Sequence, residues 1–280
     1  MENAVILGTF DGLHLGHRAV IENAKGYNII AVTFKTPPKT EFDSSVGVLM
    51  SAEDRFTCLK ELGVSEIEAL DFKEVCNVEP EEFLNDIFNR YKPSLFVCGF
   101  NYRFGKGAKG ESETLKAFCN EKQIKLKVTE SVKNDGNIVS STLIREYISL
   151  GQIEKANNLL YKPFGFSANV IKGDKRGRTL GFPTINQVYP KLLQPVKFGV
   201  YESAVIIDNI DYKAISNIGI RPTFQTEHIC SETYILNFNG DLYGKSIRVE
   251  PKRFLREERK FSSEDELKKA VLADIKSISP

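Results

Sequence analysis

The sequence AVILGTFDGLHLGH, residues 4–17, decides the fold of the first half of this chain. Its apolar start, residues 4–7, is typical of a buried strand, and the residues that follow His17 have the composition of a helix. A glycine-containing turn between a strand and a helix directs backbone N–H groups toward one point, where the helix N-terminus favours an anion. We therefore predict a nucleotide phosphate site at this turn, formed by Gly8, Thr9, Phe10, Asp11 and Gly12.

Two of the three histidines of the chain, His14 and His17, lie at the end of the same stretch. Their spacing of three residues places both imidazoles on one face of a helical turn. Two histidines beside a phosphate loop can neutralise charge on a phosphoryl or nucleotidyl group during its transfer. The competing interpretation is a surface helix with two solvated histidines, and the preceding strand and turn glycines favour the catalytic one.

Length and composition set the limits for the rest of the chain. The 280 residues suffice for two domains of roughly 150 residues each. A net charge of +1, from 38 basic and 37 acidic residues, argues against a nucleic-acid binder. Five scattered cysteines without a CxxC pair support neither a zinc site nor a disulfide framework. No apolar run approaches the roughly 20 residues of a membrane helix. We expect a cytoplasmic protein with small-molecule substrates, no nucleic-acid or membrane partner, and self-association that is at most weak.

The two halves differ in texture. Residues 1–160 alternate between strand-like runs (5–7, 29–34, 66–70, 95–98, 125–128) and helix-like runs (17–25, 52–62, 80–91, 112–121, 141–150). This alternation predicts a parallel sheet covered by helices, with ligands at the carboxyl ends of its strands. After a boundary near residue 161, closely spaced β-branched runs (166–171, 199–207, 212–218, 233–238, 247–254) predict an antiparallel barrel or sandwich. Residues 262–278 predict a closing helix capped by Ser262 or Ser263.

A second motif of the first half is VSSTLIR, residues 139–145. Its hydroxyl groups cap a predicted helix and leave backbone N–H groups exposed, and Arg145 lies one turn further on. By itself this segment is better explained as a plain Ser/Thr cap with an exposed arginine. In combination with His14 and His17, and with residues 98–105, it resembles the adenylyltransferase half of the bacterial bifunctional riboflavin kinase/FAD synthetase family.

This resemblance implies a Rossmann-like HxGH nucleotidyltransferase domain over residues 1–160 that transfers AMP from ATP to FMN and releases pyrophosphate. The implied site residues are His14 and His17 for the ATP phosphates and the transition state, Ser141, Thr142 and Arg145 for pyrophosphate, and Asn101 for the phosphate or flavin side of FMN. Residues 33–38 depart from the family pattern, which commonly has an acidic residue and a His-Pro pair there. We expect this loop to lie near the nucleotide and to affect the efficiency of the first half.

The sequence GDKRGRTLGFPTIN, residues 173–186, carries the strongest signal of the second half. Its glycines permit a tight backbone wrap and its basic residues add charge, although it is not a P-loop. By itself it is equally well a basic surface hairpin. If the chain is extended there, Thr184 and Asn186 point to one face, where their oxygens suit a hard metal ion.

This stretch resembles the riboflavin kinase signature of the same family, and the resemblance continues to the end of the chain. It implies a six-stranded β-barrel kinase domain over residues 162–280 that phosphorylates riboflavin. Glu232 is implied as the general base, and Tyr234 and Asn237 stand where the family commonly has His and Asp, which we interpret as tolerated. The remaining implied roles are ATP binding by Gly173, Lys175, Arg178 and Gly181, Mg²⁺ binding by Thr184 and Asn186, and flavin binding by Phe254 and Arg256.

The sequence therefore predicts an α/β domain followed by a β-barrel domain, together forming a bifunctional enzyme that uses Mg²⁺ and ATP with riboflavin and FMN. Two alternatives remain open at this point. One is an enzyme in which only the kinase half is active, because of the altered loop at residues 35–38. The other is a flavin-binding regulator without catalysis, which the joint presence of His14, His17 and Glu232 disfavours.

Overall fold

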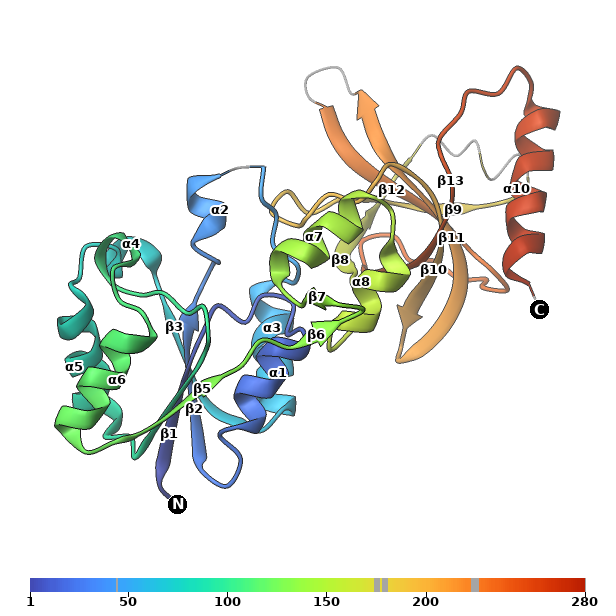
Figure 1. Cartoon of the computed structure of the whole chain (residues 1–280). Coiled ribbons are helices and arrows are strands. Elements are labelled where there is room, and N and C mark those ends of the chain that lie inside the picture. The colour runs from blue at the N-terminus through green and yellow to red at the C-terminus, as the bar shows by residue number, and fades with distance from the viewer. Residues whose placement is uncertain (44, 174–176, 178–180, 223–226, 280) are drawn as a thin grey trace. The chain divides into compact units, whose positions relative to one another are not determined.

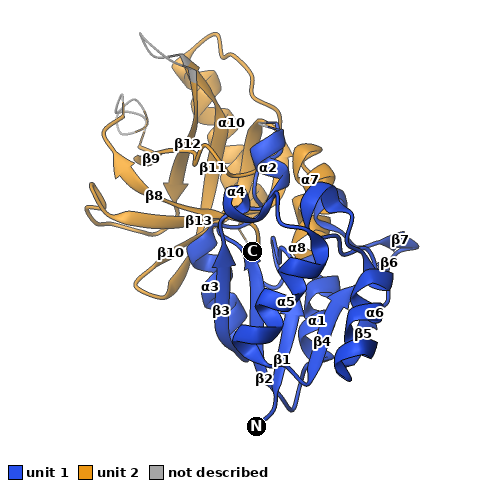
Figure 2. Ribbon diagram, turned by 90° about the vertical axis from the view of Figure 1, so that its left-hand side faces the viewer, with its two compact units in different colours: residues 1–143, 159–162 blue, residues 144–158, 163–280 orange. Residues whose placement is uncertain are grey.

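The structure is a computed structural model that describes residues 1–43, 45–173, 177, 181–222 and 227–279. It divides into two compact units, which Figure 2 shows in different colours. The first unit comprises Met1–Leu143 and Leu159–Lys162, and the second comprises Ile144–Asn158 and Pro163–Pro280. Each unit has a sheet of its own, so the fold of each is described from its own residues. Within the described residues, no helix combines the length and the apolar character needed to cross a membrane.

The first unit contains the parallel sheet that the sequence predicted (Figure 1). Its five strands lie in the order β3-β2-β1-β4-β5, and every pair is parallel. The strands are β1 (Asn3–Leu7), β2 (Asn28–Phe34), β3 (Val64–Leu70), β4 (Leu95–Gly99) and β5 (Lys125–Thr129). Strands β2 and β3 lie on one side of β1, and the later strands β4 and β5 lie on the other. The topological switch point is therefore between β1 and β4. Open α/β sheets bind their ligands at the carboxyl ends of strands at such a point.

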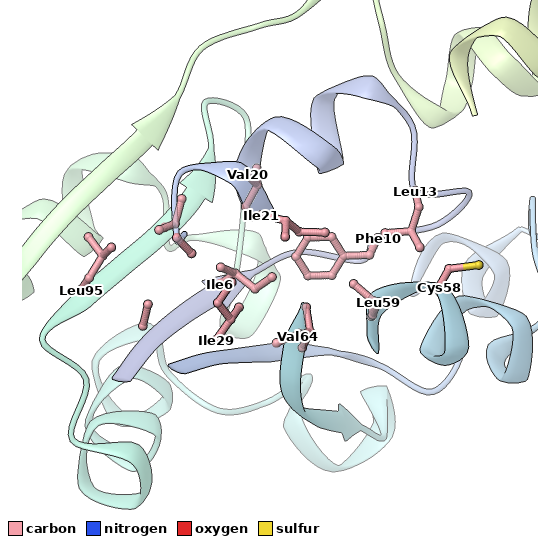
Figure 3. Close-up of a cluster of buried hydrophobic side chains, with 14 of the residues drawn as sticks. Ile6, Phe10, Leu13, Val20, Ile21, Ile29, Cys58, Leu59, Val64 and Leu95 are labelled. Atoms are coloured by element: carbon pink, nitrogen blue, oxygen red, sulfur yellow. The ribbon is translucent and has the colours of Figure 1, made fainter. Parts of the chain in front are cut away.

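Residues 4–7 of β1 are all apolar because both faces of the strand are covered there. Ala4 and Ile6 face one core cluster, and Val5 and Leu7 face a second, as alternation along a strand requires. Helices α1 (Leu15–Glu22) and α3 (Ala52–Glu61) contribute to the first cluster, part of which Figure 3 shows. Helices α5 (Pro80–Tyr91) and α6 (Ser112–Lys122) contribute to the second.

Several short elements of the first unit have no periodic pattern and were not predicted. They are α2 (Lys39–Phe42), α4 (Phe72–Val75), the 3₁₀ turn η1 (Lys106–Ala108), and a hairpin of β6 (Lys133–Asn134) and β7 (Asn137–Ile138). Helix α1 begins at Leu15 and not at His17, because His14 already serves as its N-cap. Helices α7 (Ser141–Ser149) and α8 (Ile153–Leu159) follow, and most of their residues belong to the second unit.

The second unit contains a closed antiparallel barrel of six strands, which confirms the predicted barrel. The strand order is β10-β11-β12-β9-β8-β13. The strands are β8 (Phe166–Ile171), β9 (Thr184–Val188), β10 (Gly199–Ile207), β11 (Ile210–Pro222), β12 (Glu227–Ile235) and β13 (Ser246–Arg256). The closing helix α10 (Glu264–Ile278) is confirmed, with Ser263 as the N-cap that accepts a hydrogen bond from the backbone N–H of Glu266.

The barrel strands differ from the predicted runs at two places. Strand β12 was expected at residues 233–238 but spans Glu227–Ile235. It ends early because Asn237 adopts a left-handed backbone (φ 57°) that a strand does not accommodate. Strand β9, which the sequence marked only as conditionally extended, pairs with β12 and β8 and so supplies the sixth strand.

Candidate active sites

The loop after β1 is fixed in place by its own apolar side chains. Phe10 and Leu13 are completely buried in the core cluster of Figure 3. Phe10, Gly12 and Leu13 all have a left-handed backbone, with φ of 51°, 80° and 45°. A Cβ on Gly12 would lie 2.8 Å from Leu160 Cδ2, so both the conformation and the space call for glycine. The predicted phosphate site therefore has a rigid backbone at the carboxyl end of β1.

The two histidines of this loop stack on each other. His14 is the N-cap of α1, and its Nδ1 accepts a hydrogen bond from the backbone N–H of His17 at 3.4 Å. The ring centroids lie 3.7 Å apart with an interplanar angle of 19°. Gly16 leaves room for this arrangement, because a Cβ there would lie 3.1 Å from His14 Cε1. The spacing of three residues thus brings both imidazoles to one face, as predicted.

His17 is neutral at neutral pH. Its burial, together with the nearby charges of His14 and Arg55, holds its pKa well below its usual range. Its Nδ1 is buried without a hydrogen-bond partner among the described residues, and the Phe10 ring packs edge-on against it at 5.4 Å. A neutral imidazole has one donor and one acceptor nitrogen. His17 therefore offers a ligand a hydrogen bond and not a full positive charge.

The fixed positive charge of this region comes from Arg55, which the sequence reasoning missed. Arg55 lies on α3 and is 1% exposed. Its Nη1 donates to the carbonyl of Thr9 at 2.8 Å, and its Nη2 donates to the carbonyls of Phe34 at 2.5 Å and Lys35 at 2.9 Å. It thereby joins the loop after β1 to the loop after β2. A sequence signal for this position was available. Arg55 precedes the apolar residues Cys58 and Leu59 by three and four positions, and this spacing places all three on one buried face of the helix.

Asp11 is buried and forms hydrogen bonds within the protein. It is 1% exposed, and its carboxylate accepts a hydrogen bond from the backbone N–H of Leu49 at 2.9 Å. Its carbonyl accepts a hydrogen bond from Ser141 Oγ at 3.1 Å, which joins residues 130 positions apart. The start of α7 therefore lies beside the β1 loop, as the two motifs together predicted.

The other predicted residues of the first site belong to α7 and to the segments that follow β4 and β2. Ser140 and not Ser141 caps α7, since its Oγ accepts from the backbone N–H of Leu143 at 3.2 Å. Thr142 is exposed and Arg145 lies one turn further along α7. Asn101 is exposed just after β4, the neighbour of β1 at the switch point. Residues 35–38 follow β2 on that edge, where the backbone N–H of Lys35 donates to the carbonyl of Leu70.

The second unit has a pocket of about 320 Å³ on its barrel. Asn186 of β9, Glu232 of β12 and Asn217 of β11 are partners in register across three neighbouring strands, and all three line it. The neighbouring residues Ser216 and Thr233 face the other side of the sheet. Both are fully buried and hydrogen-bond to each other at 2.8 Å. The remaining lining combines apolar and charged groups: Gly177, Phe182, Thr184, Val200, Ile215, Arg221, Tyr234, Arg256, Glu258, Arg259, Phe261, Leu267, Val271 and Asp274.

Glu232, the predicted base, is partly buried in this pocket and forms an ion pair with Arg221. Arg221 lies four residues beyond Asn217 on β11, so it reaches Glu232 from the same face of the sheet. The sequence analysis assigned no role to Arg221. This ion pair fixes the position of the carboxylate within the pocket lining.

Thr184 and Asn186 line the same pocket from alternate positions of β9. Their hydroxyl and carboxamide oxygens are hard ligands, and Mg²⁺ commonly takes one or two protein ligands together with substrate phosphates and waters. A Cβ on Gly173 would lie 2.5 Å from Asn186 Cγ, so the start of the glycine-rich stretch runs against this side chain. The donors present therefore fit Mg²⁺. Gly181 has φ 89°, and Lys175 and Arg178 lie outside the described residues.

The two predicted flavin residues lie in different surroundings. Arg256 lines the pocket, but its guanidinium makes three hydrogen bonds of 2.8–3.1 Å to the carboxylate of Asp274 and so ties α10 to β13. Phe254 is not among the described lining residues. It packs edge-on against Tyr201 with ring centroids 5.2 Å apart, under the ammonium group of Lys197.

Comparison with known proteins agrees with this division into two sites. Residues 1–143 match the FAD synthetase family, and residues 160–279 match the riboflavin kinase family. The bifunctional riboflavin kinase/FMN adenylyltransferase of Bacillus subtilis strain 168 is 32% identical, over 98% of this chain and 90% of its own length. The protein of the same name from Escherichia coli K12 is 30% identical, over 96% of this chain and 89% of its own length.

A solved structure also covers nearly the whole chain. It is described as a macrolide-efflux protein from Streptococcus pneumoniae, with a TM-score of 0.90, 30% identity, and coverage of 98% of this chain and 93% of its own. The chain belongs to the bifunctional riboflavin kinase/FMN adenylyltransferase family. This membership confirms the family, the fold class and the two transferase activities that the sequence predicted.

Proposed function

We propose that this chain converts riboflavin to FMN in its second unit and FMN to FAD in its first, with one ATP consumed in each step. The observation that carries the proposal is the pocket of the barrel, where Thr184, Asn186 and Glu232 line one cavity although they come from two strands. The stacked histidine pair at the switch point of the parallel sheet supports the second activity.

In the kinase step, Glu232 accepts the proton of the 5′-hydroxyl of riboflavin as that oxygen bonds to the γ-phosphorus and the bond to ADP breaks. Arg221 forms an ion pair with this carboxylate, and both residues line the pocket. Thr184 and Asn186 would hold Mg²⁺, which neutralises charge on the ATP phosphates. Gly173 and Gly181, with Lys175 and Arg178, are proposed to bind ATP, and Phe254 and Arg256 to bind the flavin.

In the adenylylation step, a phosphate oxygen of FMN attacks the α-phosphorus of ATP and pyrophosphate leaves. No side chain needs to form a covalent bond, so catalysis consists of positioning and charge stabilisation. We assign the ATP phosphates to His14, His17 and the backbone of residues 8–12. Ser141, Thr142 and Arg145 are proposed to bind pyrophosphate and Asn101 to bind FMN. The neutral state of His17 makes it a hydrogen-bonding group in this scheme.

The domain limits, location and partners of the chain are proposed from the same considerations. We place the adenylyltransferase domain at residues 1–160 and the kinase domain at residues 162–280. The five scattered cysteines, without a CxxC pair, support a reducing compartment such as the cytoplasm. The near-zero net charge supports small-molecule substrates without nucleic acid, and any self-association is expected to be weak.

The test is a time course with purified protein, riboflavin, ATP and Mg²⁺, followed by chromatography of the flavins. We expect FMN first and FAD after it. Glu232→Gln should slow FMN formation by roughly 10²-fold or more while FAD still forms from added FMN, and His17→Ala should stop the series at FMN. FMN that accumulates in the wild type without FAD would restrict the function to the kinase and implicate residues 35–38. Flavin binding without any turnover would show that the chain is a flavin-binding protein and not an enzyme.

A further inference from the structure

Asn217 lies beside the proposed base of the kinase pocket. It is the register partner of Glu232 on the neighbouring strand, and both residues line the pocket. The Cα atoms of such partners in an antiparallel pair are roughly 4.5–5.5 Å apart. The carboxamide of Asn217 is therefore within reach of groups attached close to the atom that Glu232 deprotonates.

Glu258 fixes the orientation of this carboxamide. Asn217 Nδ2 donates a hydrogen bond to Glu258 Oε1 at 2.8 Å. An ionised carboxylate only accepts hydrogen bonds, so the amide nitrogen and not the amide oxygen must face it. The carboxylate lies over Gly219, where a Cβ would approach Glu258 Cδ to 2.6 Å. The absence of a side chain at Gly219 thus allows Glu258 to occupy this position.

The amide oxygen is consequently directed away from Glu258. Asn217 Oδ1 is buried and has no hydrogen-bond partner among the described residues. Buried polar groups of folded proteins are nearly always paired, and an unpaired one calls for a specific explanation. Because Asn217 lines a substrate pocket, the simplest source of a donor is the ligand of that pocket.

We propose that Asn217 Oδ1 accepts a hydrogen bond from the hydroxyl on C4′ of riboflavin, next to the 5′-hydroxyl that is phosphorylated, and that Glu258 orients the amide for this contact. The inference rests on the proposed kinase function and adds a substrate-binding residue to that site. A hydroxyl on the adjacent carbon matches the short separation between Asn217 and Glu232, and its hydrogen can satisfy the unpaired oxygen. Asn217 therefore reads the polyol chain of the substrate and not its ring.

The experiment compares the full-length protein with its Asn217→Ala variant. Binding of riboflavin and of lumiflavin, a flavin ring without the polyol, is measured by quenching of flavin fluorescence. We expect the Kd of riboflavin to rise roughly 3- to 10-fold, as for the loss of one neutral hydrogen bond, and the Kd of lumiflavin to stay unchanged. The KM for riboflavin should rise and the KM for ATP should not. Asn169→Ala, which removes an exposed amide from β8 outside the pocket lining, is the matched control.

A ligand analogue supplies a test that needs no variant. The wild type should bind 4′-deoxyriboflavin more weakly than riboflavin by the same factor, and Asn217→Ala should not distinguish the two ligands. Equal losses for riboflavin and lumiflavin, an unchanged Kd for riboflavin, or a rise in the KM of ATP alone would overturn the inference. If the wild type forms no FMN, the kinase proposal fails, and the difference between riboflavin and lumiflavin still decides the role of Asn217. A wild type that binds neither flavin overturns both.

Discussion

Replacement of Arg55 by methionine is expected to destabilise the first unit by about 3–5 kcal/mol, the range for removing one partner of a buried charged interaction. The guanidinium makes three hydrogen bonds to the carbonyls of Thr9, Phe34 and Lys35. Hydrogen bonds from a charged donor contribute about 1.5–3 kcal/mol each. Two effects offset part of this loss. The variant no longer has to desolvate a buried charge, and the methionine side chain makes apolar contacts. The variant also leaves the buried carboxylate of Asp11 without the nearby positive charge.

The assay is equilibrium denaturation of the full-length protein, together with both activities. Because the three carbonyls lie in the loop after β1 and at the end of β2 and the loop that follows it, FAD formation should be lost while FMN formation persists as an internal control. Lysine at position 55 cannot reproduce the planar fork of arginine, so Arg55→Lys should recover only part of the stability.

Arg90 provides a matched control in the same unit. It pairs with Glu68 and Asp86, but its side chain is 41% exposed. Exposed ion pairs contribute roughly 0–1 kcal/mol, so Arg90→Met should be mild and should leave FAD formation intact. The reasoning is refuted if the two methionine variants are equally stable, since burial and not the number of contacts is the argued cause.

Three further predictions concern His17, Gly12 and Asp274. Burial keeps the pKa of His17 below the value of 6.5 for an unfolded chain, so only the unfolded state takes up a proton as the pH falls through this value. Stability should therefore decline below pH 6.5 in the wild type, and urea titrations of His17→Gln should show a weaker decline. Gly12→Ala should lower thermal stability by more than roughly 1 kcal/mol and slow FAD formation only, as separate assays of the two reactions would show. Asp274→Asn should weaken the attachment of α10 through Arg256 by about 1–3 kcal/mol and raise the KM for riboflavin, as thermal unfolding and steady-state kinetics would show.

Local patterns were sufficient to predict the strands of the parallel sheet, its longer helices and the histidine pair of the first site. The apolar run of residues 4–7 indicated a strand buried on both faces, and each face indeed has its own core cluster. The stacking of His14 on His17 was predictable because it depends on a spacing of three residues within one helical turn. The closing helix was predictable from its Ser cap and acidic first turn.

The partners of the charged side chains were not predictable, because they depend on contacts between distant segments. Arg55 binds carbonyls about 20 and 46 residues away, and nothing near it in the sequence indicates those loops. The pairing of Arg256 with Asp274 requires α10 to pack on β13, which the motif alone does not specify. The resemblance assigned Arg256 to the flavin, whereas the structure gives it a second task in holding the wall of the pocket.

The pairing of Glu232 with Arg221 bears on how the kinase site can work. The guanidinium of Arg221 fixes the position of the Glu232 carboxylate in the pocket lining. A strong base is not required if phosphoryl transfer proceeds through a loose transition state, in which the attacking hydroxyl is only weakly bonded to phosphorus and loses its proton late. The orientation of the hydroxyl then matters more than the strength of the base. A carboxylate held by Arg221, and a carboxamide held by Glu258 on the adjacent strand, are suited to that task.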